Sequence, residues 1–169
     1  MIVTVGHSNR TSADFVGLLG EHRIAVVADV RKLRGSRAFP QFNEARLRRA
    51  LKRADISYVP IPELAGRRTK AASPSARPCW KNRGFRNYAD HMRTGEFRDG
   101  IRKLLALKGR VAVMCAEAVP WRCHRSLIGD YLALEKKRKV LELVGNRARP
   151  HRRTACARVV RGHLTYELP

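Results

Sequence analysis

The fold is decided by the stretch from residue 2 to residue 31, which reads IVTVGHSNRTSADFVGLLGEHRIAVVADVR. Its first four residues are mostly β-branched and predict a buried strand, and Gly6-His7-Ser8 predicts the turn that follows. Ser12 is the expected N-cap of a helix, because apolar residues recur after it at helical spacing. Residues 24–30 are apolar almost throughout, which is typical of a strand covered by helices on both faces. Strand, helix and strand in this order predict a βαβ unit with two parallel strands.

The same alternation continues along the chain. Further strands are expected at 56–59, 111–115 and 140–144, and further helices after Asn43, at 88–105 and from His124. We therefore expect one α/β domain over residues 1–169, with a mainly parallel central sheet and helices on both faces in three layers. Residues 64–84, rich in Pro, Ser, Ala and basic residues, are expected to form a long, mobile loop near the site. Residues 145–169 are expected to be a basic connector and a C-terminal hairpin.

The composition is that of a folded but strongly basic chain. Apolar residues make up 44% of the 169 residues, which excludes a disordered chain, and 36 basic against 14 acidic residues give a formal charge of +22. Such a charge attracts polyanions at low salt. A solvated, arginine-rich surface accounts for it equally well, so both interpretations stay open.

Targeting and redox features predict a cytoplasmic protein. The N-terminus shows no basic leader, and no apolar run approaches the roughly 20 residues that cross a bilayer, so we expect no membrane association. In a reducing compartment the cysteines are expected to remain thiols, and no structural disulfide is predicted. The cysteines are Cys79, Cys115, Cys123 and Cys156.

Polar residues follow three of the expected strands. Gly6-His7-Ser8 follows the first, Asp29-Val30-Arg31 follows the second, and the segment 115–125 follows the fourth. Ligands of parallel sheets bind beyond the carboxyl ends of the strands, so we expect these clusters to share one anion-binding pocket. Arg31 is interpreted as an anion contact held by Asp29, and a surface ion pair is the alternative.

The segment 115–125, CAEAVPWRCHR, concentrates the residues that could carry chemistry. It leads from a strand into a helix, whose N-terminal N–H groups favour phosphate and acidify a nearby thiol. We expect Cys115, at the strand end, to be the nucleophile in preference to Cys123, with Glu117 or His7 as proton carrier. In the alternative interpretation both cysteines are small buried hydrophobes, and His124 only caps local carbonyls. A tyrosine-phosphatase loop is excluded, because Arg122 follows Cys115 one position too late.

Metal binding is a further interpretation of the same residues. The available ligands are His7, Cys115, Cys123 and His124. No paired spacing supports a site, and the neighbouring Cys123 and His124 side chains are expected to diverge. We therefore expect neither a metal nor a cofactor.

Together these motifs resemble domain-of-unknown-function family 488. The resemblance rests on Gly6-His7-Ser8, Asp29-Val30-Arg31 with Ser36 and Phe39, residues 64–68, Tyr88-Ala89, Cys115-Ala116-Glu117 with Pro120, Cys123-His124-Arg125, and residues 162–166. It implies an α/β domain with a pocket lined by these motifs, and no established reaction. Ala65 departs from the glycine common in the family, which puts the backbone geometry of that turn in question.

We predict an enzyme, a thiol-dependent hydrolase or transferase, that acts on a phosphate-bearing small molecule such as a nucleotide, or on nucleic acid. The predicted catalytic residues are Cys115, Glu117, His7 and His124. The predicted substrate-binding residues are Gly6, Ser8, Asp29, Arg31, Ser36, Tyr88, Cys123 and Arg125.

Two other functions remain open. One is a non-catalytic nucleic-acid-binding protein that contacts phosphates through Arg46, Arg49, Arg152 and Arg153. The other is a sulfur-transfer or redox module, which predicts a persulfide or a Cys115–Cys123 disulfide. Aromatic residues such as Trp80, Phe85 and Trp121 stand among basic residues, a mixture that can stack bases while holding phosphates.

Overall fold

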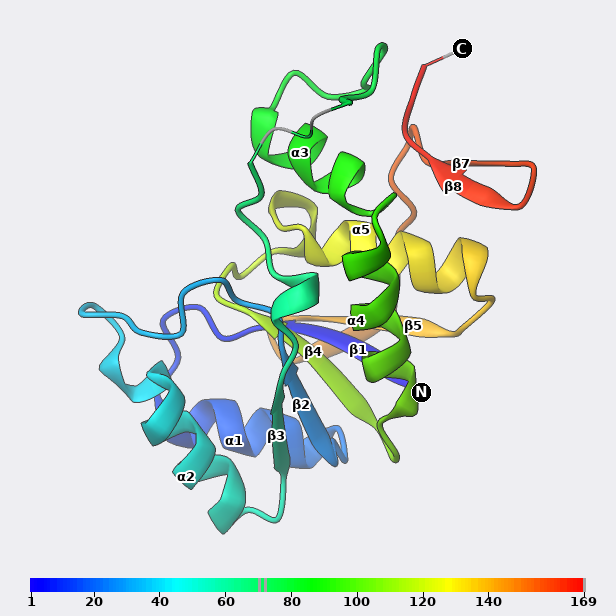
Figure 1. Cartoon of the computed structure of the whole chain (residues 1–169). Helices are drawn as coiled ribbons and strands as arrows, with labels where there is room; N and C mark the ends of the chain where they lie inside the picture. Colours follow the sequence, from blue (N-terminus) through cyan, green and yellow to red (C-terminus); the bar gives the residue numbers. More distant parts are fainter. Residues whose placement is uncertain (70, 72, 169) are drawn as a thin grey trace.

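The computed structural model describes residues 1–69, 71 and 73–168, so Lys70 and Ala72 of the expected loop and the terminal Pro169 lie outside the described residues. In the described part, six strands form one sheet in the order β3-β2-β4-β1-β5-β6, and β7 and β8 form a separate hairpin (Figure 1). The sheet strands are β1 (Ile2–Gly6), β2 (Val26–Asp29), β3 (Ser57–Pro60), β4 (Val111–Cys115), β5 (Val140–Val144) and β6 (Arg147–Pro150). The first five run parallel, which confirms the expected mainly parallel sheet.

Helices cover both faces of this sheet, as the alternation of elements predicts. They are α1 (Ser12–Glu21), α2 (Glu44–Arg53), α3 (Arg83–His91), α4 (Gly95–Ala106) and α5 (Arg125–Asp130). Buried residues of α1 and α2 pack in one apolar cluster, and those of α3, α4 and α5 pack in the other. The α/β architecture of three layers follows from this division.

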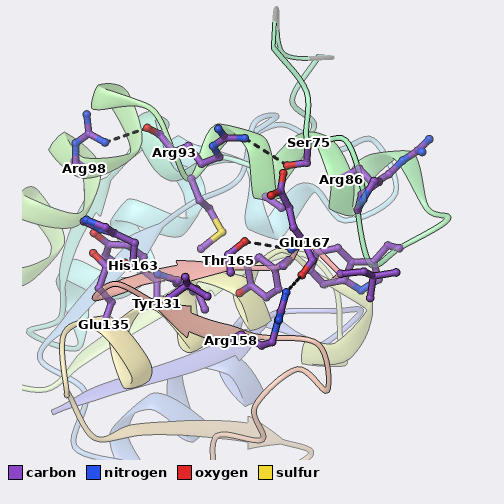
Figure 2. A pocket seen from close by; sticks show the side chains of 18 of the residues that line it. Ser75, Arg86, Arg93, Arg98, Tyr131, Glu135, Arg158, His163, Thr165 and Glu167 are labelled. Atoms are coloured by element: carbon purple, nitrogen blue, oxygen red, sulfur yellow. Dashed lines mark hydrogen bonds between the residues drawn. The ribbon is translucent and has the colours of Figure 1, made fainter.

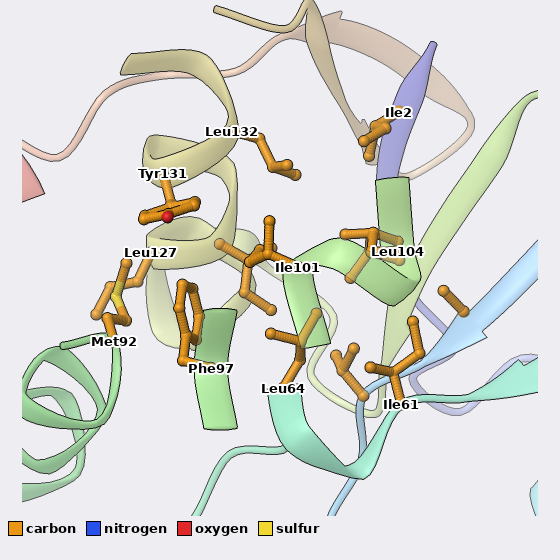
Figure 3. Close-up of a cluster of buried hydrophobic side chains, with 14 of the residues drawn as sticks. Ile2, Ile61, Leu64, Met92, Phe97, Ile101, Leu104, Leu127, Tyr131 and Leu132 are labelled. Carbon is orange, nitrogen blue, oxygen red and sulfur yellow. The ribbon is translucent and has the colours of Figure 1, made fainter. Parts of the chain in front are cut away.

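The side chains of each central strand alternate between the two apolar clusters. In β4, Val111 and Val113 face the cluster of α4 and α5, whereas Ala112 and Met114 face the cluster of α1 and α2. Successive strand side chains point to opposite faces, so an unbroken apolar run is what a strand buried on both sides requires. Figure 3 shows the first of these clusters, where Phe97, Ile101 and Leu104 of α4 meet residues from the sheet and from α5.

The expectation of a basic connector after β5 is wrong at residues 147–150. These residues form β6, which pairs antiparallel with β5. Its side chains are mostly exposed, so the segment carries no apolar run that would identify a strand in the sequence. The expected hairpin is confirmed by β7 (Arg158–Val160) and β8 (His163–Thr165).

The prediction of no structural disulfide is also wrong, since Cys79 and Cys156 are bonded with their Cα atoms 6.3 Å apart. The segment before α3 lies along the C-terminal segment, where the Cys79 N–H donates to the Tyr166 carbonyl and Pro78 bridges to Glu167. Pairing of segments so distant in the chain is invisible in composition. Much of the loop expected at 64–84 is therefore tied to other elements, and its second end is helical from Arg83.

A buried ionic network holds the C-terminal region against α5. The ring of His151 hydrogen-bonds to Asp130 Oδ1 (2.9 Å) and to Glu142 Oε1 (2.8 Å). Asp130 also accepts from the Thr154 N–H (3.0 Å) and the Tyr166 hydroxyl (2.9 Å). Burial alone would lower the pKa of His151, but hydrogen bonds to the two carboxylates outweigh it and raise the pKa to about 9. The network thus carries an imidazolium between two buried carboxylates at neutral pH.

Two helix starts differ from expectation by local hydrogen bonding. Thr11, one residue before Ser12, caps α1 by accepting from the Asp14 N–H. The Asn43 side chain does not cap α2, because its Oδ1 accepts from the Ser36 N–H at 2.6 Å instead. Within the described part of the chain, none of the helices combines the length and the apolar character that a membrane span requires.

Candidate active site

The three polar clusters meet beyond the carboxyl ends of the parallel strands, as expected from the order of strands and helices. Gly6 is in register with Cys115, and Asp29 with Met114. Beyond the strand ends the pairing continues, because the His7 N–H donates to the Cys115 carbonyl at 3.0 Å. The loop after β1 and the loop after β4 therefore form one continuous rim.

Gly6 allows this close approach. A Cβ atom at residue 6 would lie 1.9 Å from the Glu117 carbonyl oxygen and 2.9 Å from Arg125 Nη2. The backbone after β4 can cross over β1 only because residue 6 has no side chain. The glycine is therefore a packing requirement and needs no ligand contact to explain it.

We expect Gly6→Ala to lower the free energy of unfolding by at least about 1–3 kcal/mol, because the backbone at Glu117 must move. Urea unfolding measures the change. Gly17→Ala in α1 is the matched control, since its Cβ meets nothing within 4 Å. The control is expected to gain about 0.5–1 kcal/mol from helix propensity. Equal stability of Gly6→Ala and the wild type would contradict this packing.

A hollow of about 400 Å³ opens at the rim, large enough for a small-molecule ligand. Its lining residues from the predicted site are Arg31, Tyr88, Cys115, Glu117, Cys123 and His124. Cations outside the list of predicted site residues also line it: Lys32, Arg67 and Arg122. All three are exposed, and their only signal in the sequence is proximity to the motifs.

Cys115 and Cys123 face each other in this hollow, and both are free thiols. Their sulfurs and a ring nitrogen of His124 all lie within 4.8 Å of one another. Cys123 is buried whereas Cys115 is partly exposed. The structure thus places both sulfurs side by side, whereas the sequence analysis chose Cys115 alone in preference to Cys123.

Nitrogen groups of Arg125 and His124 lie against Cys123 Sγ. Arg125 Nε donates to it at 3.4 Å, and His124 Nδ1 lies 3.6 Å away. The Arg125 side chain is fully buried and also donates to the Glu117 carbonyl. His124 Nε2 lies 3.2 Å from the Val30 carbonyl, which orients the ring. The expectation that the Cys123 and His124 side chains diverge is wrong, because the turn at the start of α5 brings them together.

These contacts place the thiolate on Cys123. The hydrogen bond from the Cys115 thiol, with His124 and Arg125, outweighs burial and holds the pKa of Cys123 well below its ordinary value. The same hydrogen bond, together with burial, raises the pKa of Cys115. The contacts therefore favour Cys123, and not the expected Cys115, as the more acidic thiol of the pair.

His7 and Arg31 form a buried support behind the rim. Arg31 Nε and Nη2 donate to the Asp29 carboxylate at 2.7–3.1 Å, and Nη1 donates to the Phe42 carbonyl at 2.8 Å. His7 Nδ1 pairs with the Ser8 carbonyl, and Nε2 lies 3.3 Å from Arg31 Nη1. Burial lowers the pKa of His7 to about 4, so the ring is neutral at pH 7. Both side chains position the loops, and both ring nitrogens of His7 already have a hydrogen-bond partner, the Ser8 carbonyl and Arg31 Nη1.

The other predicted residues divide between the hollow and its supports. Tyr88 is buried in the wall, and its hydroxyl donates to the Leu64 carbonyl at 2.7 Å. Ser8 and Ser36 hydrogen-bond within their own loops and do not line the hollow. Glu117 is exposed and is one of the residues that line the hollow. Ala65 has extended backbone angles (φ −65°, ψ 145°), so an alanine is accommodated there without strain.

The four arginines predicted to contact nucleic acid are exposed but do not form one surface. Arg46 and Arg49 lie on α2, which packs against β3 at one edge of the sheet. Arg152 and Arg153 follow β6 at the opposite edge. The sequence shows these four positive charges but does not show that the two pairs lie at opposite edges of the sheet.

The sulfur pair and His124 could also hold a metal ion. Two sulfurs and one imidazole, with a side open to the hollow, are a donor set that suits catalytic Zn²⁺. The carbonyl beside His124 Nε2 gives the ring the support that metal-bound histidines have. Arg125 opposes a cation, because its guanidinium already donates to Cys123 Sγ. The expectation of no metal stays a prediction.

Comparison with known proteins identifies one family. A family model described as domain of unknown function DUF488 matches residues 11–132. No curated protein and no solved structure matches the chain. The matched range includes both cysteines of the hollow, His124 and Arg125, and it ends before β5 and the C-terminal region.

Proposed function

We propose that this chain, which belongs to the family described as domain of unknown function DUF488, is a thiol-dependent hydrolase or transferase acting on a phosphate-bearing substrate. The observation that carries the proposal is the sulfur pair in the hollow, with the Arg125 guanidinium and the His124 ring against Cys123 Sγ. A buried thiolate stabilised by cationic donors is the arrangement that nucleophilic cysteines need.

In the proposed first step, the Cys123 thiolate attacks the electrophilic centre of the substrate. A bond from Sγ to that centre forms while the bond to the leaving group breaks, and Cys115 gives its thiol proton to the leaving group. In the second step water, or an acceptor hydroxyl, displaces the sulfur while the exposed carboxylate of Glu117 takes its proton. The proton on Glu117 then returns through solvent to Cys115, so the cycle ends with the Cys115 thiol, the Cys123 thiolate and the Glu117 carboxylate with which it began. Arg125 and His124 lie against the regenerated Cys123 thiolate.

Lys32, Arg67 and Arg122 would hold the phosphate. They line the hollow and are exposed, whereas the Arg31 guanidinium donates to the Asp29 carboxylate and the Phe42 carbonyl. Arg125 is buried behind the lining, where Nε and Nη2 donate to protein groups and Nη1 has no partner. Anion binding therefore depends on these three residues more than on the arginines of the motifs. A guanidinium group can donate two parallel hydrogen bonds to a phosphate, which favours a phosphate-bearing ligand over a neutral one.

The test uses bis(p-nitrophenyl) phosphate and p-nitrophenyl phosphate as probes, with intact mass spectrometry and nitrophenolate release as readouts. The wild type is expected to show a mass increment on Cys123 and release of nitrophenolate. Cys123→Ser is expected to lose at least about 10³-fold in turnover with its circular dichroism unchanged. Retained turnover in the Cys115→Ser/Cys123→Ser double variant would refute the proposal.

A sulfur-transfer or redox module is the second candidate, favoured by the closeness of the two sulfurs. The same mass spectra separate the two functions. A persulfide, or a Cys115–Cys123 disulfide formed without any phosphate probe, would support the second candidate.

A cytoplasmic location remains our proposal from the sequence. The Cys79–Cys156 disulfide is the observation against it, because reducing compartments rarely keep structural disulfides.

A further inference from the structure

A second hollow, of about 650 Å³, lies next to the candidate active site. Trp80, Phe85, Pro120 and Trp121 give it apolar walls, and Arg149, Arg152 and Arg153 give it positive charge. Phe85 lines both this hollow and the one that contains the sulfur pair, so the two are adjacent. Trp121 itself lies between Cys115 and Cys123 in the chain.

Trp121 is presented for stacking. Its side chain is 58% exposed, which is unusual for so large an aromatic residue. The Arg149 guanidinium lies 5.1 Å from the centre of its ring. Arg149 is held there by the buried Glu142 carboxylate, to which Nε donates at 3.1 Å. A flat base could stack on this ring while a nearby arginine contacts its phosphate.

A third hollow, also lined by basic residues, lies next to the second. It measures about 820 Å³, lies between the helical layer and the β7–β8 hairpin, and shares Trp80 with the second hollow. Figure 2 shows Arg93 and Arg98 on the helical side and Arg158 and His163 on the hairpin side. The cations that line it are Arg86, Arg93, Arg98, Lys136 and Arg158, against the acids Glu135 and Glu167.

We propose that these three adjacent hollows bind single-stranded nucleic acid and that its phosphodiester backbone leads into the sulfur-pair hollow as the substrate. This inference names the substrate of the proposed thiolate site and rests on that function. A single nucleotide would fill one hollow, whereas a succession of three basic hollows joined by aromatic residues suits a polyanion with bases. Bases must be unpaired to stack on Trp121, so a single strand is favoured over a duplex.

Acidic residues do not cancel the charge of the second hollow. Glu142 is its acidic lining residue, and its carboxylate is already paired with Arg149 and His151. Arg152 and Arg153 are exposed at its mouth. Phosphates of a bound strand would therefore meet positive charge there, with counterions released on binding.

The experiment measures fluorescence anisotropy of a labelled single-stranded oligonucleotide, a duplex of the same sequence and unlabelled inorganic polyphosphate as competitor. Arg152→Ala/Arg153→Ala is expected to weaken single-strand binding about tenfold or more and to reduce its salt dependence. Trp121→Ala is expected to weaken it about fivefold or more with the salt dependence unchanged. Arg46→Ala/Arg49→Ala removes the same charge at the other edge of the sheet and is expected to change binding less than about twofold.

The inference fails if the Arg46→Ala/Arg49→Ala control weakens binding as much as Arg152→Ala/Arg153→Ala. It also fails if Trp121→Ala binds normally, if the duplex binds as tightly as the single strand, or if polyphosphate competes as well as the unlabelled oligonucleotide. The Cys115→Ser/Cys123→Ser variant is expected to bind the strand normally. If the wild type binds the strand but forms no cysteine adduct with the phosphate probes, only the thiol chemistry is overturned. If it forms the adduct but does not bind the strand, only this inference is overturned.

Discussion

Replacing Asp130 by asparagine is expected to lower the free energy of unfolding by about 3–5 kcal/mol. Asp130 is fully buried and accepts from His151, Thr154 and Tyr166. The asparagine keeps the shape but leaves the buried imidazolium of His151 short of one charged partner. Urea unfolding at pH 7 measures the loss.

Asp99→Asn is the control, because it makes the same chemical change in an exposed pair with Arg102. It is expected to cost less than about 0.5 kcal/mol. If the two variants lost equal stability, the network would not hold the C-terminal region in the way its hydrogen bonds indicate.

The effect of Asp130→Asn should also depend on pH. The folded pKa of His151, about 9, lies above its ordinary value, so its contribution is complete below about pH 6.5 and is lost as pH rises through 9. The stability difference between the wild type and Asp130→Asn should therefore shrink at high pH. Glu142 acts in the opposite range, since pairing lowers its pKa and its contribution is lost as pH falls through the folded value.

Cys123→Ser is expected to slow alkylation of the free thiols by iodoacetamide at pH 7 by about tenfold or more. The reason is that Arg125 Nε donates to Cys123 Sγ and His124 Nδ1 lies 3.6 Å from the same sulfur. In the variant only the Cys115 thiol is left, and a thiol of ordinary pKa is mostly protonated at pH 7. Peptide mapping after timed alkylation measures the rate at each cysteine.

Cys115→Ser is the control for that experiment. A serine hydroxyl can still donate a hydrogen bond to Cys123 Sγ, so alkylation of Cys123 is expected to change less than about threefold. Faster alkylation of Cys115 than of Cys123 in the wild type would restore the assignment expected from the sequence.

The sequence predicts the fold well wherever burial is two-sided. The runs that become β2 and β4 are apolar on both faces and cannot be solvated, so their strand character is visible. The strand character of β6 is not visible in the sequence, because Arg147 and its neighbours lie in the outermost strand and form no apolar run. The Cys79–Cys156 bond is invisible for another reason, since 77 residues separate its ends.

The sequence places the candidate site but not the direction of its side chains. The meeting of the loops after Gly6, Asp29 and Cys115 follows from parallel strands alone. Which sulfur carries charge depends on where the Arg125 and His124 side chains point, and spacing does not encode that. For the same reason the sequence indicates that Asp29 holds Arg31 but not that Arg31 Nη1 donates to the Phe42 carbonyl.

We infer that one thiolate exists in the hollow at neutral pH and that it belongs to Cys123. Ultraviolet absorbance of the thiolate, followed as the native protein is titrated, tests this most directly. The account predicts one sulfur that ionises well below the ordinary thiol pKa of about 8.5, lost in Cys123→Ser and kept in Cys115→Ser. A wild-type protein that develops no thiolate absorbance until the pH passes about 8.5 would contradict it.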